Sequence, residues 1–201
     1  MTPLFSTAYF PPIAYVAALL RHTDVLIEAQ ETFPKQTYRN RTVIMTAGGL
    51  RVLTVPVIRE NHSRSEEVRI DYKERWSTIH LRTLTAAYSA SPYFLYYRDG
   101  IETLLTCRYD RLIELNQALL GWLLKQLKAP CTVRLTTDYQ PAEGAEWDYR
   151  NRFSPKVPYP TEGFPTYYQV FSDRLPFAPN LGILDLLFNL GPEAHDYLKQ
   201  L

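Results

Sequence analysis

Residues 28–41 form a basic loop that could do chemistry. The loop follows the apolar run 25–27, which is typical of a buried strand, and open α/β sheets bind ligands at the carboxyl ends of their strands. Guanidinium groups bind phosphate or carboxylate through paired hydrogen bonds. The candidate substrate-binding residues of this basic loop are Lys35, Tyr38, Arg39, Asn40 and Arg41. The loop therefore predicts a site for a small anionic molecule, although a solvated loop whose arginines pair with nearby acids fits the sequence as well.

The tetrapeptide Tyr-Arg-Asn-Arg occurs twice, at residues 38–41 and 149–152. If both copies face one crevice, Arg150 and Arg152 join the arginines of the basic loop in binding one polyanion. The sequences that flank the two copies differ, so we do not infer a duplication. Unrelated surface arginines are the alternative interpretation.

His80 is the candidate catalytic residue. It lies in the stretch 76–88, where apolar residues recur at the spacing of an amphipathic helix. Imidazole titrates near neutral pH, as a general base must, but a histidine on the apolar face of a helix also fits core packing. Because neither metal-ligand spacing nor a phosphate-loop or dinucleotide fingerprint is present, we expect no metal and no cofactor.

The elements that must position these residues suggest a β-α-β unit at the N-terminal end. Residues 4–9 and 25–29 have the pattern of strands, and the helix between them starts at two adjacent prolines, which suit a first helical turn. Such a unit is parallel and right-handed, so its two carboxyl-end loops open on the same edge. We therefore expect Tyr9 and Tyr15 to face the crevice of the basic loop as further binding residues.

The rest of the body supplies more strands and a core helix. Gly48-Gly49 joins two runs rich in Val, Ile and Thr, which is typical of a β-hairpin. Residues 68–71 and 131–137 have the pattern of strands, 100–106 that of a brief helical turn, and 109–127 that of a long helix with a wide apolar face. The predicted class is α/β, a mixed sheet with an N-terminal β-α-β unit, a β-hairpin and a long core helix.

The composition changes after the body, which we place at residues 1–138. Residues 139–179 interleave prolines with aromatic rings, and this predicts a C-terminal aromatic, Pro-rich wrap over the body, since disordered segments are poor in rings. Residues 180–201 then predict short terminal helices, within one domain that spans 1–201. A non-catalytic interaction module, in which the rings of the Pro-rich coil dock a protein, is the alternative function.

Asp185 stands between large apolar residues near the end of the chain. We expect it either to meet an arginine of the two tetrapeptides or to point outward, because a buried carboxylate needs a partner.

The overall charge narrows the classes of partner. Lys plus Arg is 22 against 21 for Asp plus Glu, so no general field draws the chain to nucleic acid, and no apolar run is long enough for a membrane span. Cys107 and Cys131 lack a Cys-x-x-Cys spacing and are expected as buried thiols in a reducing compartment. With no basic segment before its first apolar residues, the chain is expected to be cytoplasmic.

Several motifs together resemble the WbqC-like proteins of bacteria. Some members of that family belong to surface-polysaccharide (O-antigen) loci, so the resemblance implies a role in making or modifying an activated sugar. Together with the position of the basic loop after the second strand, this predicts an enzyme of transferase type that takes a small anionic substrate such as a nucleotide sugar. Many relatives carry His-Gln-Pro where this chain has Ser6-Thr7-Ala8, so a step that uses that histidine is lost or done differently here. The motifs that carry the resemblance are 9–15, 33–41, Trp76 with His80, 87–88, 91–94 and 180–191.

Overall fold

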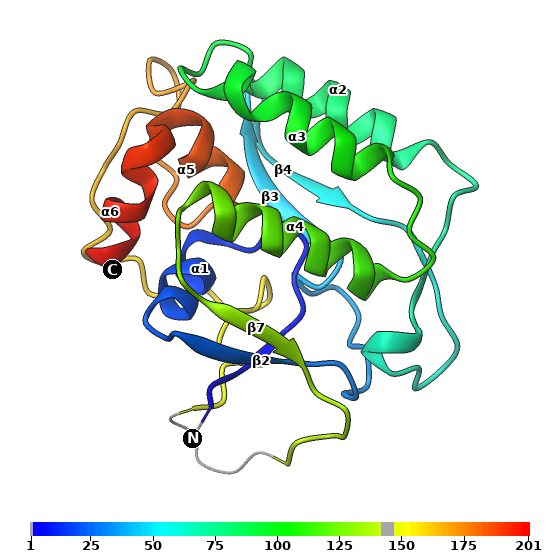
Figure 1. The fold of residues 1–201 in the computed structure, drawn as a ribbon. Helices are drawn as coiled ribbons and strands as arrows, with labels where there is room; N and C mark the ends of the chain where they lie inside the picture. Colours follow the sequence, from blue (N-terminus) through cyan, green and yellow to red (C-terminus); the bar gives the residue numbers. More distant parts are fainter. Residues whose placement is uncertain (1, 142–146) are drawn as a thin grey trace.

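The computed structural model describes residues 2–141 and 147–201, and it has the predicted α/β class (Figure 1). The part of the predicted wrap at 142–146 lies outside the described residues. The elements in chain order are β1 (Leu4–Ser6), α1 (Ile13–Leu20), β2 (Asp24–Glu28), β3 (Arg41–Thr46), β4 (Gly49–Thr54), β5 (Val57–Ile58), the 3-10 turn η1 (Ser65–Glu67), β6 (Arg69–Ile70), α2 (Trp76–Tyr88), α3 (Phe94–Thr106), α4 (Leu112–Gln126), β7 (Thr132–Leu135), α5 (Ile183–Leu190), the 3-10 turn η2 (Gly191–Glu193) and α6 (Ala194–Lys199).

A parallel sheet with the strand order β1-β2-β7 organises the N-terminal half of the core. The central strand β2 pairs with β1 through Leu4↔Leu26 and with β7 through Val25↔Val133, both in parallel. The predicted parallel β-α-β unit is therefore present. Because the three strands run the same way, their carboxyl ends meet at one edge, and this edge carries the start of the basic loop.

The antiparallel strands form two ribbons apart from the parallel sheet. In the hairpin β3-β4, Thr46 pairs with Gly49, whose φ of +99° is the positive value that the tight turn requires. A shorter ribbon pairs β5 with β6 through Val57↔Ile70. Pro56 separates β4 from β5, as expected of a residue that lacks the N–H needed for a ladder.

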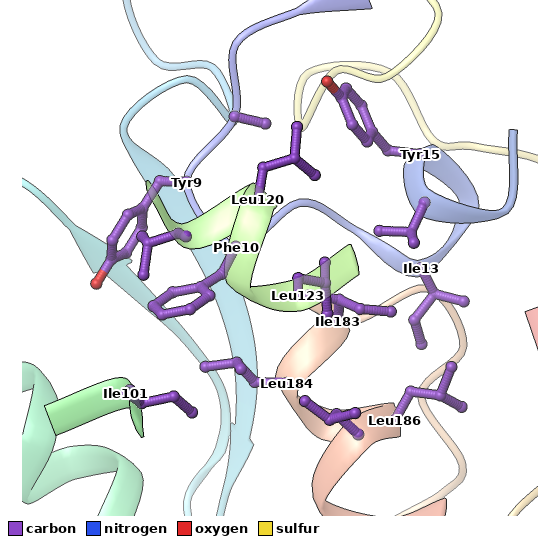
Figure 2. Close-up of a cluster of buried hydrophobic side chains, with 14 of the residues drawn as sticks. Tyr9, Phe10, Ile13, Tyr15, Ile101, Leu120, Leu123, Ile183, Leu184 and Leu186 are labelled. Carbon is purple, nitrogen blue, oxygen red and sulfur yellow. The ribbon is translucent and has the colours of Figure 1, made fainter. Parts of the chain in front are cut away.

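The core lies where α4 packs between the parallel sheet and the pair α2 and α3 (Figure 1). Helix α4 buries eight side chains, which confirms the predicted core helix. Figure 2 shows Leu123 of α4 beside Ile183 of α5, with Leu184 and Leu186 of α5 in the same cluster, whereas the side chain of Leu120 points toward the side of Tyr15. Because α5 comes from the C-terminal part of the chain, the terminal helices belong to the same core as the body.

Helix α3 is longer than the sequence pattern suggested. We expected a brief turn at 100–106, whereas the helix starts at Phe94 and buries Phe94, Tyr97, Ile101 and Leu105 on one face. Their spacing of three, four and four residues is helical, but exposed aromatic neighbours in the same stretch conceal it.

The described part of the wrap, 139–141 and 147–179, packs against the body as predicted. Its first turn pairs with β1, since the N–H of Leu4 donates to the carbonyl of Trp147 at 2.9 Å and that of Tyr149 donates to the carbonyl of Leu4 at 2.8 Å. The ring of Tyr149 stacks on buried Phe5 with centroids 4.5 Å apart. Tyr149 therefore helps to cover the core, whereas Tyr159 and Tyr168 of the wrap are 36% and 61% exposed.

The prediction that both cysteines are core thiols is wrong for Cys107, which is exposed, and Cys131 is only half-buried. Cys107 directly follows the last residue of α3, where the helix ends at the surface. Within the described residues, none of the helices has the length and apolar character to cross a membrane.

Candidate functional site

The basic loop is held in a fixed shape by hydrogen bonds to distant segments. The carbonyl of Tyr38 accepts from the N–H of Tyr9 at 2.9 Å, which joins the loop to the chain after β1. The amide of Asn40 donates to the carbonyl of Val55 at 2.9 Å, and the N–H of Val55 donates back to Asn40 at 2.8 Å. The side chain of Asn40 therefore fixes the start of the hairpin.

Arg39 is paired within the loop itself. Its Nε and Nη2 donate to the two carboxylate oxygens of Glu31 at 2.8 and 2.7 Å, and the two side chains are only 4% and 12% exposed. Burial raises the pKa of Glu31, while the guanidinium of Arg39 acts in the opposite direction. This bidentate pair makes Arg39 a residue that positions the loop.

Arg150 of the second tetrapeptide is paired in a similar way. It donates to Asp148 at 2.9 and 2.6 Å and to Glu28, at the end of β2, at 3.3 Å. Glu28 is fully buried and also accepts from the hydroxyl of Thr136 at 2.7 Å. The Arg150 guanidinium holds the pKa of Asp148 below its usual value. Arg39 and Arg150 thus pair with nearby acids, but both are buried, so they are neither arginines of a solvated loop nor surface arginines.

Three other cations of the predicted site lie nearer the surface. Lys35 is exposed, and Arg41 is half-buried at the first position of β3. The buried Nε of Arg41 has no hydrogen-bond partner among the described residues. The exposed guanidinium of Arg152 lies 4.5 Å from the centroid of the Tyr149 ring. In the basic loop, Lys35 therefore offers an accessible donor, and Arg41 has a donor without a partner among the described residues.

His80 is 4% exposed and lies inside an aromatic cluster. Its Nδ1 is 2.8 Å from the hydroxyl of Tyr9, its ring centroid is 5.3 Å from that of Trp76, and it hydrogen-bonds the backbone of Thr54. Burial lowers the pKa of His80 to about 4, so the imidazole is neutral at pH 7. A neutral ring that donates to Thr54 accepts from Tyr9, which uses both ring nitrogens.

His80 and the basic loop nevertheless meet in the same part of the molecule. Thr54, whose backbone bonds His80, is the residue directly opposite Arg41 in the β3-β4 ladder. Tyr9 bonds His80 through its hydroxyl and Tyr38 through its N–H. The basic loop and the helix of His80 are therefore neighbours in the backbone, within a packed interior.

Tyr9 and Tyr15 are core residues, 0% and 2% exposed, although we expected both to face a crevice. Figure 2 shows their rings at two ends of the apolar cluster with the oxygens directed away from it. The hydroxyl of Tyr15 donates to the carbonyl of Ser6 at 2.7 Å, and burial raises the pKa of both phenols. Each ring fills the core while its hydroxyl fixes a neighbouring segment.

The two tetrapeptide regions do meet at one surface hollow of about 110 Å³, which we call the Tyr38 hollow. Tyr38 comes from the first tetrapeptide, and Phe153 directly follows the second. Burial raises the pKa of Tyr38. The lining residues are Pro12, Tyr38, Phe153, Ser154, Pro155, Val157, Pro158, Tyr159 and Asn180.

The Tyr38 hollow lies beside the N-terminal end of α1. Asn180 adopts a left-handed φ of +57°, and its Oδ1 accepts from the N–H of Ala14 at 2.8 Å. The N–H of Ile13 donates to the carbonyl of Leu181 at 3.0 Å. Because the first amides of α1 already have partners, a ligand in this hollow must be held by side chains.

Asn116 of α4 is a residue of this region that the sequence pattern did not reveal. Its Nδ2 donates to Thr7 at 3.0 Å and to the carbonyl of Arg39 at 2.8 Å, so it joins the end of β1 to the basic loop. It is 1% exposed, and its Oδ1 has no partner within the described part of the chain. In the sequence, the sign that Asn116 has a structural role was its position as a polar residue among the leucines of a core helix.

Asp185 contradicts both expectations for it, since it is buried and its partners are not arginines. It accepts from the hydroxyl of Tyr88 at 2.9 Å, the hydroxyl of Tyr167 at 2.5 Å and Nε2 of Gln169 at 2.9 Å. Burial raises its pKa, and the three donors act in the opposite direction. The carboxylate thus ties the wrap to α2 and α5.

The His, Cys, Asp and Glu side chains of residues 2–141 and 147–201 form no group of three or more that could hold a metal ion. The polar groups around the basic loop can therefore bind, orient or move protons by hydrogen bonding and charge.

Comparisons with known proteins identify a family whose profile covers the basic loop and His80. The sequence profile of the WbqC-like protein family matches residues 7–159, which include the basic loop, His80 and the second tetrapeptide. The uncharacterized protein Rv1507c of Mycobacterium tuberculosis is 29% identical over 221 aligned positions, which cover 95% of this chain and 91% of that protein. No solved structure matches the chain.

Proposed function

This chain belongs to the WbqC-like protein family, and from that premise we propose that it is a cytoplasmic enzyme of transferase type that binds a phosphate-bearing sugar donor at the Tyr38 hollow. The donor class is a nucleotide sugar or another anionic activated sugar. The observation that carries the proposal is that Tyr38 of the first tetrapeptide and Phe153, which directly follows the second, line a single hollow.

The walls of the Tyr38 hollow suit a sugar derivative. Tyr38, Phe153 and Tyr159 present aromatic rings, on which sugar rings and bases pack. Sites for complete drug-sized ligands occupy about 300–1,000 Å³, so a hollow of about 110 Å³ holds a single group of the donor. The rest of the donor would then lie outside it, along the basic loop.

Lys35 and Arg41 are the cations that we assign to the donor phosphates. They stand three residues before and three residues after Tyr38, so both belong to the loop that forms one wall of the hollow. The guanidinium of half-buried Arg41 would bind a phosphate oxygen, while Lys35 supplies an exposed ammonium. In this proposal Arg39, Asn40 and Arg150 keep the loop and the wrap in place, and Arg152, the last residue of the second tetrapeptide, packs on the Tyr149 ring.

His80 as general base remains a prediction within this proposal. Its neutral ring can accept a proton, but its 4% exposure means that substrate reaches it only if the aromatic cluster opens. Turnover in His80→Asn tests the role: an unchanged rate excludes a general base, whereas a loss of about 100-fold or more with unchanged donor affinity supports it.

A thermal-shift screen tests donor binding. Wild-type protein is mixed with nucleotides, nucleotide sugars and acyl carriers, and we expect stabilisation by nucleotide sugars that weakens in Arg41→Ala and in Tyr38→Ala. Arg51→Ala is the matched control, since Arg51 is an exposed arginine of the same hairpin. A panel without stabilisation, or one that Arg41→Ala and Arg51→Ala alter equally, contradicts the proposal.

A further inference from the structure

A second hollow of about 350 Å³ lies on another part of the surface, between the start of α3, the end of α4 and the η2-α6 turn. We call it the Tyr96 hollow. It shares no lining residue with the Tyr38 hollow. Its lining residues are Tyr93, Tyr96, Tyr97, Gln126, Leu127, Lys128, Pro192, His195 and Asp196.

The walls of the Tyr96 hollow are held in place by tight packing. The Tyr93 ring lies against Gly191, where an added Cβ would come within 2.5 Å of the ring, and Gly191 has a positive φ of 55°. The Tyr97 ring meets those of Tyr96 and Trp122 edge-on, at centroid distances of 4.8 and 6.1 Å. A cavity whose walls are fixed in this way binds without a large cost of ordering.

The polar groups of the Tyr96 hollow are varied. Three tyrosines, Tyr93, Tyr96 and Tyr97, line the hollow, and burial, followed by the neighbouring phenols of Tyr96 and Tyr93, raises the pKa of Tyr97. Around them stand the amide of Gln126, the half-buried imidazole of His195 and the carboxylate of Asp196. The hollow therefore offers hydrogen-bond donors and acceptors beside aromatic faces.

Lys128 adds an ammonium group at the rim from a backbone conformation that does not favour lysine. It follows the end of α4 with a left-handed φ of +51°, where glycine is usual. Such a conformation costs about 1 kcal/mol or more in a residue other than glycine.

We propose that the Tyr96 hollow binds a pyranose ring, either as a free monosaccharide or as the end of a glycan. A pyranose has an apolar C–H face that packs on tyrosine rings and a rim of hydroxyl groups that pair with amides, imidazoles and carboxylates. The volume of about 350 Å³ is within the range for small-molecule sites and is large enough for one ring. A planar nucleobase could stack on the same rings but would leave most of the polar rim unpaired.

Saturation-transfer NMR tests this proposal with N-acetyl-D-glucosamine, a chitotriose oligosaccharide and adenosine as probes. We expect transfer to the ring protons of the monosaccharide, of the terminal sugar of the oligosaccharide, or of both, and these two arms distinguish a free sugar from a glycan end. In Tyr96→Ala we expect the signal to fall at least fivefold; this side chain is 75% exposed, so the fold should tolerate the change. Leu95→Ala is the matched control, because Leu95 is its 68% exposed neighbour on α3.

Two further variants keep the result interpretable. Lys128→Gly suits the left-handed backbone and should keep the protein folded while it lowers the sugar signal about threefold. Arg51→Ala changes an exposed arginine that lines neither hollow and should leave the sugar signal unchanged, while the thermal-shift screen judges the donor site, so a failure of the donor site and a failure of the Tyr96 hollow are distinguishable. No transfer to either saccharide, transfer to adenosine alone, or an equal signal in Tyr96→Ala and Leu95→Ala overturns the proposal.

Discussion

The buried carboxylate of Asp185 should be one of the main supports of the fold, and its removal gives a prediction with a definite size. It is fully buried and accepts three hydrogen bonds, from Tyr88, Tyr167 and Gln169. Asp185→Ala leaves those three donors without their acceptor, and each buried donor left unsatisfied costs about 1 kcal/mol or more. We therefore expect the free energy of unfolding to fall by about 3 kcal/mol.

Urea denaturation followed by tryptophan fluorescence measures this loss. For a chain of this length, about 3 kcal/mol corresponds to a Tm lower by roughly 6–12 °C. Asp196→Ala is the control, because its carboxylate is 79% exposed and pairs only with Lys199 at 3.4 Å, so we expect no measurable change. A loss below about 1 kcal/mol in Asp185→Ala would refute the reasoning that this carboxylate ties the wrap to the body.

Three further predictions concern Arg39, the pH dependence of Asp185, and His80. Arg39→Ala leaves Glu31 buried without its partner and should cost about 3 kcal/mol in urea denaturation, whereas Arg98→Ala breaks an exposed pair and should cost almost nothing; equal losses would contradict the first role. Burial raises the pKa of Asp185 above 3.8, so the protonated side chain contributes most to the free energy of unfolding below pH 3.8. This contribution is lost as the pH rises through the raised pKa. In Asp185→Asn, a plot of the free energy of unfolding against pH should lack this loss. Because burial lowers the pKa of His80 from 6.5 to about 4, stability present above pH 6.5 is lost as the pH falls to about 4, by at most about 3 kcal/mol, and the same curve measured on His80→Asn should lack this loss.

The parts of the fold that were predictable depend on local signals. Adjacent glycines set the hairpin, adjacent prolines set the start of α1, and the dense leucines of α4 marked it as the core helix. The pairing of β2 with β7 joins residues more than 100 positions apart, so its register depends on packing that no local pattern contains. Helix α3 was underestimated because exposed Leu95 and Tyr96 obscure the spacing of its buried face.

The sequence indicated segments that could form a site, but it did not indicate their contacts. Tyr38 of the first tetrapeptide and Phe153 after the second line one hollow, and the backbone of Thr54, opposite Arg41, bonds His80. It did not reveal which cations are already paired, because Glu31 and Asp148 are only two of many acids until the chain folds. Both tyrosines of the N-terminal unit are core residues for a similar reason, since a phenol satisfied by Ser6 or His80 can be buried as readily as it can bind a ligand.

The most direct test of donor binding is a crystal structure of the protein with the nucleotide sugar that stabilises it most in the thermal-shift screen. We predict that the sugar or base enters the Tyr38 hollow against Tyr38 and Tyr159, and that the phosphates lie within hydrogen-bond distance of Lys35 or Arg41. Electron density for the donor at any other place, or at the Tyr38 hollow with its phosphates directed away from both cations, would contradict the account.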